Sequence, residues 1–454
     1  MKKIIAKILI IAITLYSLPV NARSGISIIS DAQTQKFLEE LSCPLIKAAK
    51  LDPDHIKIYI VNDSTINAFV TQGQNIFINT GLITKFKTPD SLIGVISHEV
   101  GHIASGHLAR SSEEYKKAKN TAIVGYVLGI AAMIAGSPGA AQGLLIGGTD
   151  IAQKSMLKYT RSQEESADKN ALTYLNEIKY PSDGLRKLLE SFELASRGIK
   201  GEINEYLLSH PVSKKRIDYL NNNKQANVSN VKINKKLQPQ MDDVLAKLEG
   251  FMDEPYQVIK KYEGRSDRYA KYALSIAYFR DSKTRKALKM IDDLIKSNKD
   301  NGFFYEFKAQ ILYETGFMSP AIVNYKKAID KIEPKYAVDS RLYLAKAILN
   351  ITDHDQKLIQ YAIDNLLVSK RYRASSPFLY RQLYIAYNKL GNKALSSYNH
   401  ANYNYLLGKV NEAYKYAKIA KKESGKSKDV SKGDKLKIED LIEVIKDDKR
   451  LRPT

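Results

Sequence analysis

Two histidines and a glutamate within one five-residue stretch have the types and spacing needed to hold a metal ion and activate water. The stretch is His98-Glu99-Val100-Gly101-His102, which reads H-E-x-x-H. Histidines four residues apart lie about 400° around a helix axis, so both imidazoles share one face and can reach one ion. The glutamate lies beside that face, where its carboxylate can accept a proton from water. The pattern predicts a zinc site with His98 and His102 as ligands and Glu99 as general base.

This motif is short, so its meaning depends on the surrounding segment being helical. Thr88 followed by Pro89-Asp90 predicts a helix start, because threonine can cap a helix and proline suits its first turn. Apolar residues then recur at helical spacing, namely Leu92, Ile93, Ile96, Val100 and Ile103. The competing interpretation is a core helix with two hydrogen-bonded histidines. We favour the metal site, because a buried helix is the context that the motif requires.

A hydrolytic zinc site needs a third protein ligand. No histidine follows His102 at the metzincin spacing. His107 lies about 140° from the ligand face, so it is expected to pack or to support a ligand histidine. Further along, Glu164 and Asp168 form E-x-x-x-D on one helical face. Glu164 could bind the ion, and Asp168 could hydrogen-bond the free nitrogen of a ligand histidine.

Three segments in this order resemble the family-48 zinc metallopeptidases. They are the H-E-V-G-H motif, Tyr159–Asp168 (Y-T-R-x-x-E-x-x-A-D) and His210–Arg216 (H-P-V-S-K-K-R). The family includes membrane-embedded enzymes and soluble periplasmic ones. The resemblance implies zinc bound by His98, His102 and Glu164, with Glu99 as general base and Asp168 supporting a ligand.

The resemblance also implies that His210 lies near the zinc ion. There it could be a fourth ligand that closes the site until it is displaced, or it could stabilise the oxyanion of the transition state. Without the resemblance, His210-Pro211 would be taken for a turn. Arg216 is expected to form a salt bridge in the same region.

Residues 66–70 and 75–82 are similar to the sheet region of the same family. The resemblance implies an edge strand, Asn75, Ile76, Phe77 and Ile78, with which an extended substrate would pair by β-augmentation. The alternative is an ordinary hairpin with one buried face.

The first 22 residues have the features of a secretory signal peptide. Met1-Lys2-Lys3 is basic, an apolar run extends from Ile8 to Val20, and Val20-Asn21-Ala22 resembles a cleavage site. An uncleaved anchor is the alternative, although the run is short for a membrane span. Cys43 is the only cysteine and can form no internal disulfide. We therefore expect export, cleavage after Ala22, and a periplasmic protein stabilised by its core and its metal.

The chain is strongly basic, with 71 lysines and arginines against 49 acidic residues and a formal net charge of +22. Such a charge could attract an anionic membrane surface. We prefer a solvated surface as the explanation, because the lysines are dispersed. No nucleic-acid-binding motif is present, so no nucleic-acid partner is expected.

Residues 121–149 contain no charged side chain, but Gly136-Ser137-Pro138-Gly139 interrupts them. A membrane span needs about twenty continuous apolar residues. We therefore expect two buried helices, or a hairpin resting on the membrane surface. Because this stretch separates the two ligand helices, it could gate the cleft.

The second half of the chain repeats with a period of 34 residues, which is the tetratricopeptide period. Gly316 and Gly408 suit turns between paired helices, and each precedes an alanine by five residues. The pairs at this spacing are Ala287 and Ala321, Ile291 and Tyr325, and Leu294 and Ala328. About four repeats are expected, with a generic helical bundle as the alternative. A solenoid of this kind offers a concave surface for peptides or partner proteins.

The expected organisation is a signal peptide (1–22), a protease domain (23–225), a linker (226–244), a tetratricopeptide-like domain (245–425) and a basic tail (426–454). The tail contains an amphipathic segment from Leu436 to Ile445. The fold class is α+β. It combines a mainly helical zincin-type domain carrying a small edge-strand sheet with an all-α solenoid.

The resemblance implies an exported zinc metalloendopeptidase of envelope quality control. It would cleave misfolded or stalled outer-membrane proteins, and the solenoid could contact their assembly machinery. One alternative is a periplasmic chaperone or assembly factor with latent protease activity. Another is a scaffold with a vestigial site, against which the intact ligands and base argue.

Overall fold

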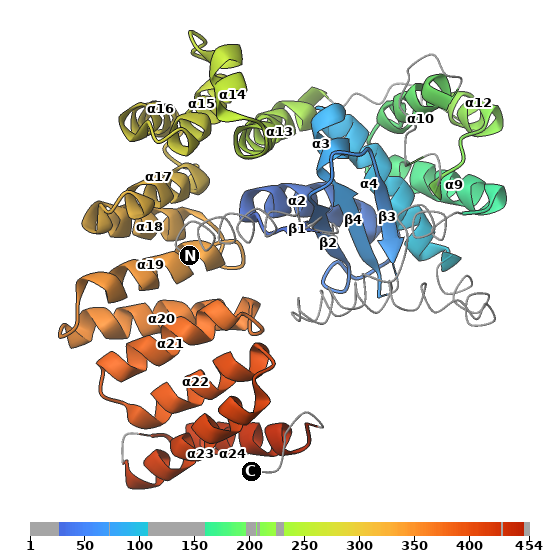
Figure 1. Cartoon of the computed structure of the whole chain (residues 1–454). Coiled ribbons are helices and arrows are strands. Elements are labelled where there is room, and N and C mark those ends of the chain that lie inside the picture. Colours follow the sequence, from blue (N-terminus) through green and yellow to red (C-terminus); the bar gives the residue numbers. More distant parts are fainter. Residues whose placement is uncertain are drawn as a thin grey trace, which may run out of the picture.

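The structure is a computed structural model that describes residues 27–71, 73–107, 159–196, 206, 209–223, 231–427 and 430–448. A small sheet with helices packed on it precedes a curved stack of helices (Figure 1). This arrangement confirms the α+β class. The predicted signal peptide and the apolar stretch 121–149 lie outside the described residues. None of the helices in the described ranges is long and apolar enough to cross a membrane.

Four strands form one mixed sheet in the order β1-β2-β4-β3. They are β1 (Ile28–Ile29), β2 (Lys57–Val61), β3 (Ala68–Thr71) and β4 (Asn75–Asn79). β3 and β4 form an antiparallel hairpin, β2 pairs parallel to β4, and β1 pairs antiparallel to β2. One face packs into the main core, and the other carries a row of stacked rings, Tyr59, Phe77 and Phe69.

The prediction that residues 75–78 form an edge strand is wrong. β4 pairs with β2 on one side and with β3 on the other, and all five of its residues are buried. The hairpin could be recognised from its local pattern. The parallel pairing with β2 could not, because it joins segments that no tight turn connects. Among the described strands, β3 is the edge next to β4.

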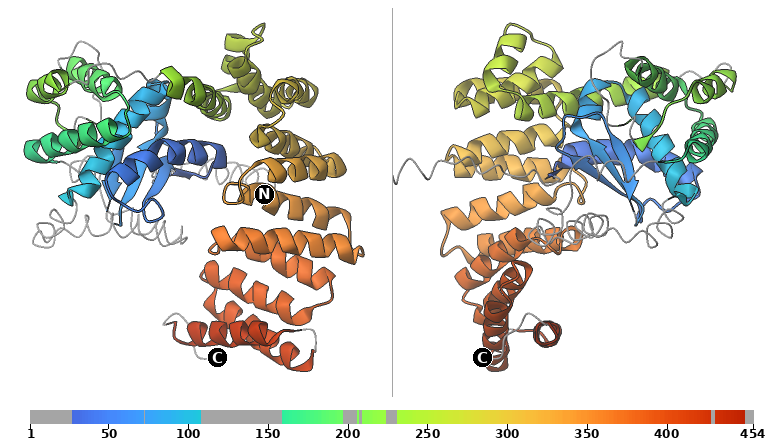
Figure 2. Two further views of the ribbon diagram at one scale, coloured as in Figure 1. Left: turned by 180° about the vertical axis from the view of Figure 1, so that it is seen from behind. Right: turned by 45° about the vertical axis from the view of Figure 1, so that its right-hand side comes forward.

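Helices pack on this sheet and on one another beside it. α2 (Ala32–Ala48) and α4 (Pro89–Ala104) contact the sheet and each other, and α9 (Arg161–Glu177) and α10 (Asp183–Ser196) pack against α4. α3 (Thr80–Lys85) follows β4 directly, and α12 (Lys214–Asn222) contacts both α9 and α10. α4 thus lies at the centre of the region (Figure 2).

The segment predicted as a linker, 226–244, is helical from Val231 onward. α13 (Val231–Met252) continues through it despite Pro239, and Met241 and Val244 lie in the same core as the sheet. α13 also packs against α15 (Arg268–Arg280), the first long helix of the stack. The helix therefore packs on both regions that it connects.

After α13 and α14 (Pro255–Tyr262), the described helices form five successive hairpins (Figure 1). The pairs are α15 with α16 (Thr284–Ser297), α17 (Gly302–Glu314) with α18 (Met318–Lys331), α19 (Val338–Ile351) with α20 (Gln356–Tyr372), α21 (Pro377–Lys389) with α22 (Lys393–Leu406), and α23 (Val410–Lys426) with α24 (Lys432–Lys446). α24 lies in the segment expected to be a basic tail. Its Ile438, Leu441 and Ile445 form a core with α23, so most of that segment is a packed helix.

Candidate metal centre

α4 carries the H-E-x-x-H motif on a buried helix, as the sequence predicts. Thr88 caps the helix by accepting a hydrogen bond from the Ser91 amide, and Pro89 occupies the first turn. His98, Glu99 and His102 are all fully buried. The helix context that distinguishes a metal site from a chance motif is therefore present.

α9 brings Glu164 and Asp168 against α4. A capping box formed by Thr160 and Gln163 fixes the start of α9, so Glu164 follows in its first turn. Both carboxylates are buried. The two helices approach closely because position 101 is a glycine, and a Cβ there would lie 2.7 Å from the Ala167 carbonyl oxygen.

Four buried side chains, His98, His102, Glu164 and His210, place one donor atom each within 4.8 Å of one another. The His98 Nε2 atom lies 3.0 Å from His102 Nε2 and 3.3 Å from His210 Nδ1. The Glu164 Oε1 atom lies 3.3 Å from His102 Nε2 and 3.0 Å from His210 Nδ1. Tetrahedral zinc with bonds of about 2.0–2.1 Å separates its ligand atoms by about 3.3–3.4 Å. The donor set and its spacing fit a zinc ion.

The outer nitrogens of the two helix histidines each face a second buried group. His98 Nδ1 lies 2.9 Å from Asp168 Oδ1, as expected for a carboxylate that orients a ligand. His102 Nδ1 lies 2.9 Å from His107 Nδ1. Of the two roles expected for His107, packing or supporting a ligand histidine, this contact matches the second.

Arg216 forms ion pairs with two carboxylates of α9, those of Glu164 and Asp168. Its guanidinium binds both oxygens of Asp168 at 2.6 and 2.9 Å, and its Nη1 lies 2.5 Å from Glu164 Oε2. Arg216 also donates to the Pro211 carbonyl, which ties the segment after His210 to the site. The salt bridge expected of Arg216 is thus buried and involves both acidic residues.

Electrostatics at the site separates the roles of the two glutamates. Burial favours protonation of Glu164, but His210, Arg216 and His98 outweigh it and hold its pKa well below the usual range. Burial raises the pKa of Glu99, and no cation among the described residues lies as close to it as Arg216 lies to Glu164. Within the described residues, neither Glu99 oxygen accepts a hydrogen bond. Glu164 is therefore suited to bind a cation and Glu99 to exchange a proton.

The two helix histidines, His98 and His102, also differ in the direction of their pKa shifts. Burial alone would lower the pKa of His98, but Glu164 and Asp168 raise it to about 9. Burial lowers the pKa of His102 well below its ordinary value, which favours the neutral imidazole that a metal requires. A bound cation would favour the neutral form of His98 too.

Two tyrosines that residue-by-residue reasoning did not single out pack on these imidazoles. Tyr159 stacks on His102 with ring centroids 3.7 Å apart, and Tyr206 stacks on His210 at 4.4 Å. Tyr159 opens the Y-T-R segment, so its position in the motif could have indicated it. Tyr206 precedes His210 by four residues, which is one helical turn.

The residues expected to bind substrate are not at an open edge. Asn75, Ile76, Phe77 and Ile78 all lie within β4, between two other strands. The hairpin partner β3 is the strand that could accept a further chain.

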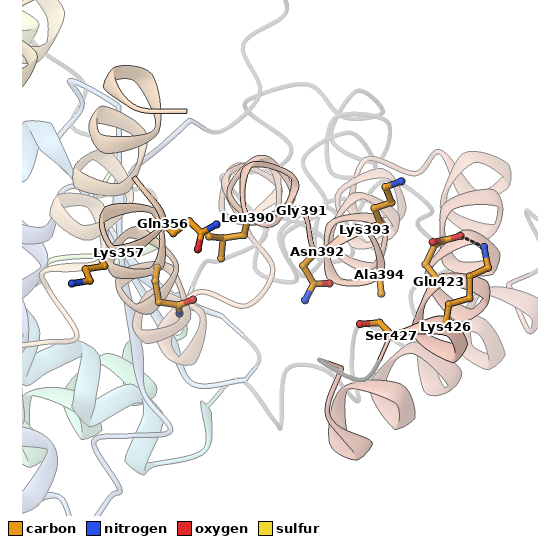
Figure 3. A pocket seen from close by; sticks show the side chains of 11 residues that line it. Gln356, Lys357, Leu390, Gly391, Asn392, Lys393, Ala394, Glu423, Lys426 and Ser427 are labelled. Atoms are coloured by element: carbon orange, nitrogen blue, oxygen red, sulfur yellow. Dashed lines mark hydrogen bonds and ion pairs between the residues drawn. The ribbon is translucent and has the colours of Figure 1, made fainter. Parts of the chain in front are cut away.

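A cavity of about 790 Å³ lies far from this centre, between α20, the α21–α22 turn and α23 (Figure 3). Its lining is mainly polar, and Glu423 and Lys426 pair with each other at its rim. No histidine or cysteine lies among the residues that line it.

The part of the chain that carries this centre is similar to known peptidases. Residues 32–224 match Peptidase family M48. The chain is 24% identical to the Beta-barrel assembly-enhancing protease of Yersinia pestis over 319 residues, and to that of Escherichia coli (strain K12) over 322 residues. Each match covers 68% of this chain and 64% of the relative. The chain therefore spans less than two thirds of the length of these relatives.

A shorter match is the Mitochondrial metalloendopeptidase OMA1 of Schizosaccharomyces pombe. It is 27% identical over 161 residues, which are 36% of this chain and 44% of that protein. All four donors of the buried cluster lie within the matched residues. Residues 32–224, which carry the buried donor cluster, are therefore the part of the chain that is similar to Peptidase family M48.

Proposed function

We propose that this protein is an exported zinc metalloendopeptidase. The observation that carries the proposal is the buried group of four donor atoms with the Glu99 carboxylate beside it. His98, His102 and Glu164 would hold the zinc ion. When bound, zinc would supply Lewis acidity and lower the pKa of water. A hydroxide nucleophile would then be available at neutral pH to attack a peptide.

Glu99 would carry the proton through the reaction. Its carboxylate would take the proton from the attacking water and return it to the amine that leaves. The raised pKa of Glu99 and its lack of hydrogen-bond donors in the described part suit a group that is protonated in one step and deprotonated in the next. Asp168 and His107 would keep the ligand histidines in fixed orientations.

His210 would control access to the metal. Its Nδ1 lies at the fourth corner of the donor set, the position that hydrolytic zinc sites leave open. In this arrangement the site is closed, and His210 would have to move before a substrate carbonyl could enter. Its Nε2 lies 3.6 Å from Glu99 Oε1. A displaced His210 could therefore remain close enough to stabilise the oxyanion, the other role considered for it.

The substrate would be an extended polypeptide. β3 is the edge strand next to β4, and a peptide could pair with it by main-chain hydrogen bonds. The names of the bacterial relatives connect them with β-barrel assembly. We infer that misfolded or stalled outer-membrane proteins are the substrates of this protein. It would act on them in the periplasm, after a signal peptide of residues 1–22 has been removed. The helical hairpins would act as tetratricopeptide repeats that bring these clients, or their assembly machinery, to the domain.

A second function is favoured by one observation, the position of His210 at the fourth corner. A site that is closed in its resting state also suits a chaperone or assembly factor whose protease activity is latent. Glu99→Gln separates the two functions, because it removes the base and leaves the donor atoms in place.

The test is zinc content and cleavage of unfolded casein by the purified chain. We expect one zinc per wild-type chain, and Glu99→Gln should keep the zinc and lose at least about 100-fold in cleavage rate. Glu165→Gln is the matched control, because Glu165 is the next residue after Glu164 but pairs on the surface with Lys215. It should retain both zinc and activity. A Glu99→Gln chain that still cleaves casein at the wild-type rate would refute the proposed base.

Rescue of an envelope defect in living cells distinguishes the two functions. If Glu99→Gln restores a deletion strain fully while zinc stays bound, the chaperone function is the biological one.

A further inference from the structure

His210 is oriented differently from the other two histidines of the centre. The outer nitrogen of His98 faces Asp168, and that of His102 faces His107, each at 2.9 Å. The outer nitrogen of His210, Nε2, makes no hydrogen bond to any described residue, and Glu99 Oε1 lies farther from it, at 3.6 Å. Metal-binding histidines nearly always have such a partner, which fixes the ring. Something else must set the orientation of the His210 ring.

Tyr206 provides that contact. The two rings are stacked with centroids 4.4 Å apart and planes 17° apart, and both side chains are fully buried. The His210 amide also donates to the Tyr206 carbonyl at 2.7 Å. Ring and backbone of Tyr206 thus act together on the segment that carries His210.

The stacking continues away from the metal centre. Phe192 of α10 stacks on Tyr206 at 4.6 Å, and Phe86 at the end of α3 meets Phe192 edge-on at 5.8 Å. The row Phe86, Phe192, Tyr206 and His210 therefore links the sheet-side helices to the fourth donor. Offset-stacked and edge-to-face pairs are the favourable geometries of aromatic rings.

Resting on the proposed function, we propose that Tyr206 is a positioning residue that holds His210 in the closed site. Stacking sets the orientation of the His210 ring, whereas polar groups at 2.9 Å, Asp168 and His107, face the outer nitrogens of His98 and His102. A stacked pair contributes less than a buried hydrogen bond to a charged group. His210 is consequently the donor that leaves first, and Tyr206 determines how readily it leaves.

The test uses the full-length chain with cobalt(II) in place of zinc, because the visible spectrum of cobalt(II) reports the number of protein ligands. Tyr206→Phe keeps the ring, and Tyr206→Leu removes it. The spectrum of Tyr206→Leu should move from that of the wild type towards that of His210→Ala. In the zinc form, its metal should pass to a chelator roughly two- to tenfold faster. Tyr206→Phe should match the wild type in both measurements.

Two further variants keep the test decisive if Tyr206→Leu does not fold. Phe192→Leu removes the second ring of the row and should shift the spectrum in the same direction, by less. Phe37→Leu is the control, because Phe37 is equally buried in the same core but takes no part in the row. It should lower the melting temperature without changing the spectrum.

Wild-type spectra for Tyr206→Leu and Phe192→Leu would overturn the inference. So would complete loss of metal from Tyr206→Leu, because Tyr206 would then support the whole centre. A wild-type chain that binds no stoichiometric metal would instead refute the proposed zinc site, so the two failures are distinguishable.

Discussion

The Nδ1 atoms of His102 and His107 lie 2.9 Å apart, although a continuous helix would direct their side chains about 140° apart. The contact exists because α4 ends at Ala104. Gly106 then adopts φ +65°, which turns the chain back over the last turn of the helix. A glycine tolerates this left-handed conformation without the steric cost that other residues incur. The end of α4 thus supplies the outer partner of a metal-facing histidine.

We expect His107→Ala to weaken metal binding by about 10- to 100-fold, the usual effect of removing the outer partner of a ligand histidine. The His102 ring would lose the group that fixes its tautomer. Competition with a chelator of known zinc affinity measures the change. His55→Ala serves as control, because His55 is exposed and pairs only with Asp52 on the surface. Equal affinities for wild type and His107→Ala would show that the contact does not orient His102.

Arg216 is predicted to be irreplaceable by lysine. Its guanidinium reaches both oxygens of Asp168, Glu164 Oε2 and the Pro211 carbonyl at once. A lysine ammonium cannot span these acceptors. Arg216→Lys should lower the free energy of unfolding, and Arg216→Met should lower it further, by about 3–5 kcal/mol, because two buried carboxylates then share no cation.

Urea titration of the two Arg216 variants gives these free energies. Metal-loaded samples should show the smaller loss, because a bound cation partly replaces the arginine charge. A stability order with Arg216→Met above Arg216→Lys would contradict the prediction.

The Gly101 position inside the motif sets the distance between the ligand helices. A Cβ on residue 101 would lie 2.7 Å from the Ala167 carbonyl oxygen and 3.2 Å from its Cα, and backbone atoms cannot move aside easily. Gly101→Ala should therefore separate α4 from α9, lower stability by about 1–3 kcal/mol and reduce zinc content. Gly425→Ala is the matched control, because a Cβ there meets no atom within 4 Å and alanine favours the helix. Thermal melting and metal analysis of both variants test this.

Much of this centre could be predicted from the sequence, because its information is local. The motif, the Thr88 cap and the Glu164–Asp168 spacing each lie within one helix, where residue spacing determines the face. Tyr206 and His210 are also only four residues apart. Their stacking, however, depends on the orientation of both rings, which residue spacing does not determine.

The features that the sequence did not reveal depend on contacts between distant segments. The parallel pairing of β2 with β4 makes β4 an inner strand, and no local pattern encodes a strand's second neighbour. The helix α13 was mistaken for a linker because its start follows a polar stretch and Pro239 lies inside it. Burial of Met241 and Val244 against the sheet core stabilises it despite that proline.

Glu306 should make the helical hairpins less stable as the pH rises. Burial raises the pKa of this carboxyl, which contacts Ser340 Oγ at 2.5 Å, from 4.5 to about 7. The folded chain therefore keeps this proton to a higher pH than the unfolded chain does. The stabilisation that the protonated carboxyl contributes is complete below pH 4.5. The effect is lost as the pH rises from about 4.5 through 7.

Glu306→Gln should consequently raise the melting temperature at pH 8 and leave it unchanged at pH 4. Calorimetry at the two values checks this, with the exposed Glu314 of the same helix as the control for the same substitution. A larger gain at pH 4 than at pH 8 would mean that the sign of the pKa shift is wrong.

The turns within the helical hairpins lead to a reciprocal prediction. Gly316 and Gly391 adopt φ values of +88° and +75° within two hairpins, and Gly408 adopts +75° between α22 and α23. Ser282 adopts +57° at the equivalent place in the first hairpin, five residues before Ala287. A side chain in this conformation costs about 1–2 kcal/mol. Ser282→Gly should therefore raise the melting temperature, although the more flexible unfolded chain offsets part of the gain. Gly316→Ser should lower it, because a Cβ at Gly316 meets no neighbour and only the backbone strain remains. Measured together by calorimetry, the two substitutions should shift the transition in opposite directions; a shift in the same direction would show that the turn conformation does not limit the stability of the stack.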